Sequence, residues 1–370
     1  MRSFLVGLAL TALAAAGGVL ARSAAACELC SPPPPEFATV QAELEAAATV
    51  VLADLAGRDM NGRPLFVVRD VLRGGETLIA GQSVAVDHAV SGDGVYLLFG
   101  NLGSFEARRP RRVDEDVAAF ATLVARAPAA LEAEPSVWGE RLALMVPYLS
   151  DRNTLISTSA SAEFAAAPYE AVHAASKRVK PGLLLAALTD RGTEPRSRGA
   201  LALLLALSGD AEHGAALQPL LRDEQYRASA GYDAIVAAYL MLRGREALDE
   251  IRGILRARLE VGDARTGLNV LAALRFHAQR TKVLPREAIL AEVRALLADD
   301  ALAPAAILEL ATLEDWQSLP AVMDAFRRLR PKGPMILGPA ARFLTECPLP
   351  EAEAARTEVM GRRPPGSDAD

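Results

Sequence analysis

The pattern of apolar and polar positions changes twice along the chain, and each change predicts a different kind of structure. An uncharged apolar run, Phe4–Leu20, comes first, and short β-branched runs separated by glycines fill residues 49–100. From Asp114 onward, apolar residues recur every three or four positions almost to the end. We therefore predict an α+β protein, mostly α, in which a small N-terminal β-barrel is followed by an α-solenoid of antiparallel helix pairs.

Short apolar segments between turn signals predict the strands of the barrel. They are Thr49–Leu55, Leu65–Leu72, Ser83–Asp87 and Val95–Gly100. Several short strands at this spacing are typical of small barrels and sandwiches. We assign residues 49–105 to this unit.

Helical periodicity predicts the elements on either side of the strands. A short helix is expected within Glu36–Ala48, before the first strand. After the strands, helices are expected over Asp114–Ala127 and Ser136–Leu149, with Asp114 and Ser136 as N-caps. We assign residues 106–150 to these connecting helices.

A repeat follows the connecting helices. Corners that end one apolar helix and open another occur at Gly209, Gly244 and Asp315, and the spacing implies further corners near Gln279 and Cys347. The period is about 35 residues, typical of stacked helix pairs. We therefore predict a HEAT-like α-solenoid over residues 151–360 and a disordered tail over 361–370. Its amphipathic stripes predict that Leu255 and Val293 are core residues.

The N-terminal residues have the layout of a cleaved secretory signal. A basic start at Arg2 precedes the apolar run, and small residues then lead to Ala26. We predict a signal peptide over residues 1–26, cleaved at or within one residue of Ala26. The mature protein is then secreted or periplasmic, with no membrane span.

A Cys-x-x-Cys motif begins the predicted mature chain. Residues 27–48 comprise Cys27 and Cys30, the spacer Pro32–Pro35 and the short helix. A local disulfide is the leading interpretation of the pair; lipidation of Cys27, metal chelation and redox exchange are the alternatives. The prolines separate the pair from the first strand, so the barrel is expected not to depend on it. Cys347 is interpreted as a buried small apolar residue.

Composition and motifs narrow the function classes. Forty basic residues against 46 acidic ones argue against broad nucleic-acid binding. The chain has no Gly-x-Ser-x-Gly, Walker, Gly-x-Gly-x-x-Gly or His-Glu-x-x-His motif, and its four histidines lie far apart. We therefore predict no catalytic residue, no cofactor and no metal site. The basic run Arg108–Arg112 is interpreted as a solvated linker.

Two family resemblances rest on particular residues. Residues 27–100 resemble the netrin/TIMP-like fold, an OB-type barrel, in the paired cysteines and in the segments Phe66–Gly74 and Gly94–Phe99. The metalloproteinase inhibitors of that superfamily have Cys-x-Cys and later barrel cysteines, whereas this chain has Cys-x-x-Cys and no later barrel cysteine. The whole chain also resembles secreted bacterial proteins of unknown function with degenerate HEAT-like helices, in Ala160–Ala165 and Leu310–Trp316.

These features favour an exported, non-enzymatic interaction protein that uses the surface of its helical repeats. Its partner is expected to be an unidentified protein in the cell envelope or outside the cell, and not a nucleic acid. The alternative is a TIMP-like inhibitor or metal-chelating protein that acts through Cys27. An enzyme ranks third, because no constellation of residues supports one.

Overall fold

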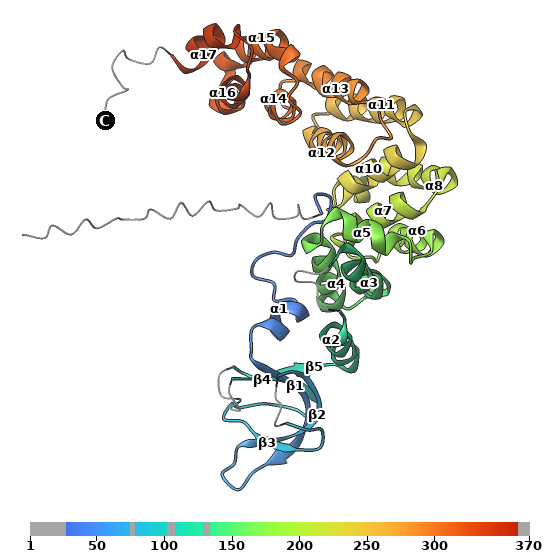
Figure 1. Cartoon of the computed structure of the whole chain (residues 1–370), viewed down its shortest axis with the longest axis vertical. Helices are drawn as coiled ribbons and strands as arrows, with labels where there is room; N and C mark the ends of the chain where they lie inside the picture. The colour runs from blue at the N-terminus through green and yellow to red at the C-terminus, as the bar shows by residue number, and fades with distance from the viewer. Residues whose placement is uncertain (1–26, 75–77, 102–104, 106–107, 129–133, 362–370) are drawn as a thin grey trace, which may run out of the picture.

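The computed structural model describes residues 27–74, 78–101, 105, 108–128 and 134–361. The signal peptide expected over residues 1–26 lies outside the described residues, as does the expected tail beyond Gly361. Figure 1 shows a small sheet at one end of the molecule and a long curved array of helices that leads away from it.

The sheet is antiparallel and open. Its strands are β1 (Thr49–Arg58), β2 (Pro64–Arg73), β3 (Ser83–Ala85), β4 (Val95–Gly100) and β5 (Arg111–Val113), in the order β3-β2-β1-β4-β5. The four predicted strands are therefore present, but the predicted barrel is wrong. The strands β3 and β5 have three residues each and form the two opposite edges of the sheet, so they do not pair with each other.

Both faces of the sheet are covered, which explains why it does not need to close. Inward residues such as Val50, Leu97 and Phe99 belong to one apolar core with the helices, while Phe66 and Tyr96 belong to a separate cluster on the other face. The rings of Phe66 and Tyr96 meet edge to face, with centroids 5.3 Å apart. Helices on one face thus replace the second layer that a barrel would have supplied.

The interpretation of Arg108–Arg112 as a solvated linker is wrong. Arg111 begins β5, which pairs with β4, and its guanidinium forms an ion pair with Glu43 of helix α1 (Val40–Glu45). Arg108 lies 3.8 Å from the same carboxylate and over the ring of Phe99. The basic run therefore joins the sheet to α1, which is shorter than the helix expected within residues 36–48.

Helices fill the chain beyond the sheet. They are α2 (Glu115–Arg126), α3 (Pro135–Met145), α4 (Thr154–Ala166), α5 (Tyr169–Ser176), α6 (Pro181–Thr189), α7 (Ser197–Ser208), α8 (Ala211–Arg222), α9 (Glu224–Arg227), α10 (Tyr232–Arg243), α11 (Glu246–Glu260), α12 (Ala264–Arg280), α13 (Arg286–Ala295), α14 (Ala303–Thr312), α15 (Leu319–Leu329), α16 (Leu337–Glu346) and α17 (Ala352–Met360), with short 3₁₀ turns between some of them. Among the described residues of 150–350 there is no strand.

The predicted helix starts are partly right. Asp114 caps α2, because its side chain accepts a hydrogen bond from the Val117 N–H at 2.8 Å. Ser136 is not a cap: α3 begins one residue earlier, at Pro135, whose missing N–H and fixed φ suit the first helical position.

The helices beyond α10 form two rows. Figure 1 shows α12, α14 and α16 on the inner side of the curve and α11, α13, α15 and α17 on the outer side. The chain turns between helices at residues 209–210, 244–245, 281–285, 313–315 and 347–351, where corners were predicted. Leu255 and Val293 are buried, as their stripes predicted, and so is Cys347.

Candidate functional site

A segment of the chain itself, at the start of the described residues, lies on the inner side of the helical array. We call residues 27–37 the strap; Figure 1 shows it running from the middle of the array toward α1. Cys27 and Cys30 form a disulfide, and the Cys30 N–H donates to the Cys27 carbonyl at 3.1 Å. Cys27, Leu29 and Cys30 are 6%, 3% and 5% exposed and belong to the core shared with the helices. The start of the strap is thus a closed ring that packs against the array.

Three contacts fix the strap to the helices. A Cβ on Gly199 of α7 would stand 2.3 Å from the Leu29 carbonyl oxygen, so the two backbones touch where only glycine leaves room. Glu28 forms an ion pair with Arg280, the last residue of α12, at 2.7 Å. Where the prolines begin, Arg196 donates a hydrogen bond to the Pro32 carbonyl at 3.1 Å. Prolines have no N–H to donate, so the strap is held through carbonyls and side chains.

The strap divides the inner side into a covered part and an open part. Every residue of α7 from Ser197 to Ala206 is buried, and so is every residue of α10 from Ala234 to Leu240. Further along, α12 exposes Leu268 and Gln279 on the side that also carries Arg275. The strap reaches from α7 to the end of α12, and the open part begins there.

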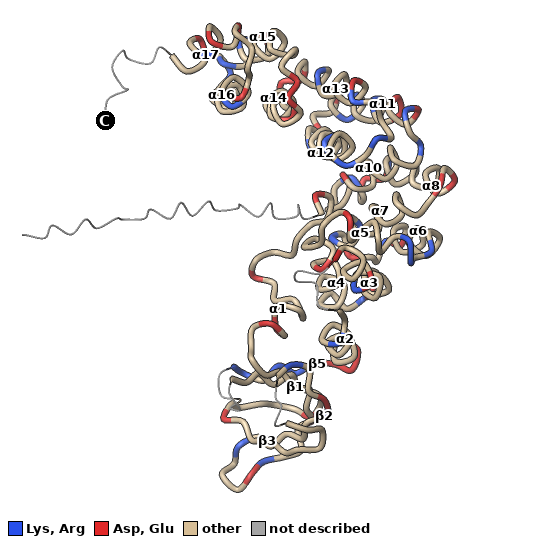
Figure 2. The backbone as a smooth tube through the Cα atoms, viewed as in Figure 1, with Lys and Arg blue, Asp and Glu red and all other residues tan. Residues whose placement is uncertain are grey.

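Charged residues of alternating sign follow successive helices, from the start of α10 in the covered part to the helices of the open part. Asp233 lies on α10, Arg275 on α12, Glu309 on α14 and Arg342 on α16. Figure 2 shows acidic and basic positions interspersed along this part of the chain. Arg275 forms an ion pair with Glu309, and Arg342 interacts electrostatically with the same carboxylate. Arg275 and Arg342 are partly exposed, whereas Glu309 is buried between them, so the row presents mainly its two guanidinium groups.

Burial changes the acidity of two groups in this row. Glu309 is 8% exposed, and loss of water raises the pKa of its carboxyl group, against the opposing effect of Arg275. Its Oε2 atom has no hydrogen-bond partner among the described residues. Burial likewise raises the pKa of Asp233. Burial thus disfavours the charged form of both carboxyl groups.

A groove of about 450 Å³ runs beside the proline part of the strap. Pro32–Pro35 and Phe37 line it on one side, and Ala162, Ala165 and Ala166 of α4 on the other. Just beyond the strap, the N–H of Val40, the first residue of α1, donates to the Ser159 hydroxyl of α4 at 3.0 Å. The groove is thus a continuation of the strap's path over the array.

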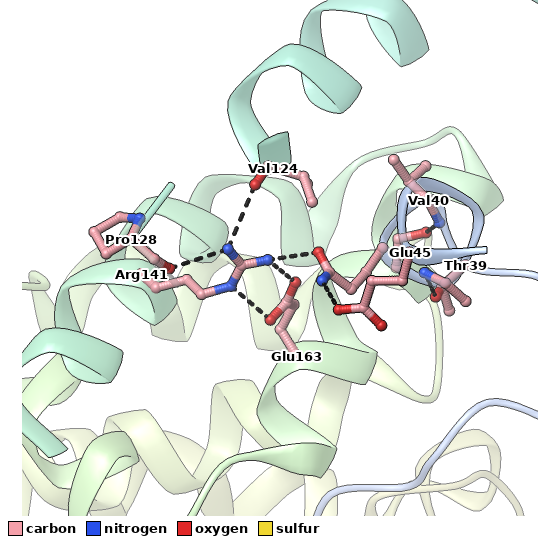
Figure 3. Close-up of polar contacts among 10 residues, drawn as sticks. Thr39, Val40, Glu45, Val124, Pro128, Arg141 and Glu163 are labelled. Atoms are coloured by element: carbon pink, nitrogen blue, oxygen red, sulfur yellow. Dashed lines mark hydrogen bonds and ion pairs between the residues drawn. The ribbon is translucent and has the colours of Figure 1, made fainter. Parts of the chain in front are cut away.

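A buried arginine holds the groove's walls in place (Figure 3). The guanidinium of Arg141 on α3 is paired with Glu163 of α4 and donates to the Gln41 side chain of α1 at 2.7 Å. It also donates to the carbonyls of Val124 and Pro128 at 3.4 and 3.2 Å. All three guanidinium nitrogens are engaged, so Arg141 joins the helices around the groove and is not available to a ligand.

The histidines are not gathered into a site. His277 of α12 is completely buried; its Nε2 lies 2.9 Å from the Ala237 carbonyl and its Nδ1 lies 2.9 Å from the Thr281 hydroxyl. Burial lowers the pKa of His277 to about 4, so it is neutral and ties α12 to α10. His213 helps to cap α8 through Asp210. In the part of the chain that the structure describes, no group of three or more His, Cys, Asp or Glu residues could hold a metal ion.

The sequence singled out Cys27 and Cys30, but it did not reveal where they dock. Their partner helix starts some 170 residues later in the chain, as shown by Gly199 and Arg196. A lone glycine in the apolar helix Ser197–Ser208 was the only local signal, and a glycine in a helix is equally compatible with close packing against a neighbouring helix. The alternating row Asp233–Arg275–Glu309–Arg342 was also missed, because it exists only once the helices are stacked.

Comparisons with known proteins do not assign this chain to a family. No protein-family model, curated protein or solved structure matches the chain. Within the described ranges, every helix is too short or too polar to cross a membrane. The interpretation of the site therefore depends on its physical features alone.

Proposed function

We propose that this protein is an exported, non-enzymatic interaction protein whose inner helical face binds an extended polypeptide segment of another protein. The observation that carries the proposal is the strap, because this face already holds a segment of the chain itself, in which a disulfide-closed turn leads into a run of prolines. The strap uses backbone contact at Gly199, an ion pair at Arg280 and a carbonyl acceptor at Pro32. A partner segment can use the same kinds of contact on the open part.

The arrangement of the helices supports a HEAT-like α-solenoid as the scaffold. Stacked helix pairs bury their apolar faces against their neighbours and leave a long inner surface. Arg275 and Glu309 lie 34 positions apart on α12 and α14, and Arg342 lies 33 positions beyond Glu309 on α16. Equivalent positions thus recur at nearly the predicted period. A segment that crosses these helices meets the partly exposed guanidinium groups of Arg275 and Arg342.

The alternative proposal, a metal-chelating or TIMP-like inhibitor acting through Cys27, has less support. It requires a free thiolate, and the Cys27 sulfur is bonded to Cys30 and buried. We therefore propose a protein partner in the cell envelope or outside the cell. The net charge of −6 gives no support to a nucleic-acid partner.

Site-specific photo-crosslinking tests the proposal. A photoreactive amino acid replaces Ala272, which lies between Leu268 and Arg275 on α12, and in a control it replaces Arg256 on the outer helix α11. We expect position 272 to yield one discrete cross-linked polypeptide in cells that express the protein, and position 256 to yield none. Equal cross-linking from both positions, or none from position 272, contradicts the proposal.

A further inference from the structure

The strap has the features of a removable occupant. It lies at the start of the described residues and is held on the array mainly by the ring closed between Cys27 and Cys30. Beyond the ring, the prolines contribute the carbonyl contact to Arg196 and line an open groove. Detaching the ring would uncover α7 without breaking any contact between the helices.

We propose that the face of α7 beneath the ring is a second polypeptide-binding surface, which the strap keeps closed while the Cys27–Cys30 bond is intact. The proposal deepens the proposed function: it assigns a further stretch of the same inner face to binding and gives it a redox control. The partner is a polypeptide segment of another protein with an acidic residue next to a bulky apolar one.

The strap itself defines this partner chemistry. Glu28 meets the guanidinium of Arg280, and Leu29, the next residue, is buried against the helices. The carbonyl of Leu29 contacts Gly199, so the incoming backbone must approach α7 directly. A partner segment with the order acidic, then apolar, satisfies the same charge and fills the same apolar site. Arg280 is itself only partly buried, so it can exchange one carboxylate for another.

The disulfide sets the strength of the closed state. It fixes the four residues of the ring in the shape that fits α7, so docking costs little further ordering. A dithiol that reduces the bond becomes a disulfide itself, the Cys27–Cys30 bond breaks, and each cysteine sulfur takes up one electron and one proton to become a thiol. The opened strap regains freedom and docks more weakly. Both cysteines are nearly buried when docked, so reduction follows transient detachment.

A synthetic strap peptide tests the proposal in trans. The peptide has the sequence of residues 27–37 with its disulfide closed and a fluorescent label at its C-terminal end. We expect saturable binding to the full chain with Cys27→Ser and Cys30→Ser, at least about tenfold tighter than to the wild-type chain, whose own strap competes. Adding Gly199→Ala to the double variant should abolish binding. Equal binding to the wild-type chain and the double variant, no binding to either, or binding unaffected by Gly199→Ala overturns the proposal.

Reduction kinetics provide a readout that does not need the double variant to fold. The wild-type chain is treated with dithiothreitol, trapped thiols are counted by mass spectrometry, and helix content is followed by circular dichroism. We expect reduction without loss of helix, and about tenfold faster reduction for Gly199→Ala, because its ring detaches more often. Reduction only when the helices unfold overturns the proposal. Arg275 on the open face is not involved in either assay, so failure here leaves the proposed function standing.

Discussion

Replacing Gly199 by alanine tests whether the strap is docked where the structure places it. In an ordinary helix interior this change is stabilising by about 1 kcal/mol, because alanine loses less backbone entropy on folding than glycine does. In α7 the new Cβ would stand 2.3 Å from the Leu29 carbonyl oxygen and 3.4 Å from the Cys30 Cα. Both atoms belong to backbone, so no side-chain rotation relieves the contact. The strap must move away or α7 must shift.

The cost follows from what the displaced ring buries. Full burial of a leucine side chain contributes about 2 kcal/mol, and the two half-cystines add to it. The Glu28–Arg280 pair is partly exposed and adds less than about 1 kcal/mol. Undocking therefore costs about 2–4 kcal/mol, against a helix gain of about 1 kcal/mol. We expect Gly199→Ala to lower the free energy of unfolding by about 1–3 kcal/mol.

Urea denaturation followed by circular dichroism measures this change, and Gly253→Ala is the matched control. Gly253 lies in the interior of α11, and no atom lies within 4 Å of a Cβ built there. The control should therefore be neutral or stabilising by up to about 1 kcal/mol. If Gly199→Ala stabilises the protein as much as Gly253→Ala does, the strap does not rest on α7.

Three further changes probe the interior, each by urea denaturation. Glu163→Ala should lower the free energy of unfolding by about 3–5 kcal/mol, because Arg141 stays buried without its partner. Combining Arg141→Met with Glu163→Met should cost far less than the sum of these two single methionine changes. Additive costs would contradict the role of the pair. Leu255→Ala and Val293→Ala should each cost about 2–5 kcal/mol, and values near zero would mean that these side chains are not in the core. The free energy of unfolding of the wild-type chain should fall as the pH is lowered from 6.5 to about 4, and His277→Gln should weaken this pH dependence. The same pH dependence in both proteins would contradict the burial of neutral His277.

The direction of the histidine effect follows from proton linkage. The folded-state pKa of His277 is lowered to about 4 from the ordinary value of 6.5, so between these values the unfolded chain binds the proton and the folded chain does not. Lowering the pH therefore favours unfolding. The loss approaches the order of 3 kcal/mol by pH 4, and the contribution is fully present above pH 6.5.

Local sequence patterns predicted most strands and helix corners, whereas features that depend on long-range contacts could not be predicted. The strands over residues 49–100 and the corners at Gly209 and Gly244 depend on alternation and on glycine, which act within a few residues. Strand β5 was missed because three residues rich in arginine have no apolar alternation; their pairing with β4 and with Glu43 decides their structure. The strand propensity of the residues is a weak guide where tertiary contacts outweigh it.

Neither the open form of the sheet nor the docking of the strap could be predicted, because both depend on contacts between residues that lie far apart in the sequence. A run of short strands is equally compatible with a barrel or with an open sheet that helices cover. Here α1 and α2 pack on one face of the sheet, and the sheet stays open. The Cys-x-x-Cys motif indicated a local bond, yet its packing partner, Gly199, lies far away in the sequence. One sequence carries no signal that joins two such positions.

The central claim is that the inner face of the helical array binds extended polypeptide, and one affinity comparison tests it most directly. The segment recovered by cross-linking at position 272 is synthesised and titrated against the wild-type chain and against two matched variants, Arg275→Gln on the inner face and Arg256→Gln on the outer face. We predict that Arg275→Gln weakens binding by about tenfold or more, corresponding to about 1.4 kcal/mol, and that Arg256→Gln leaves it unchanged. Equal affinity for all three proteins, or a loss confined to Arg256→Gln, would contradict the claim.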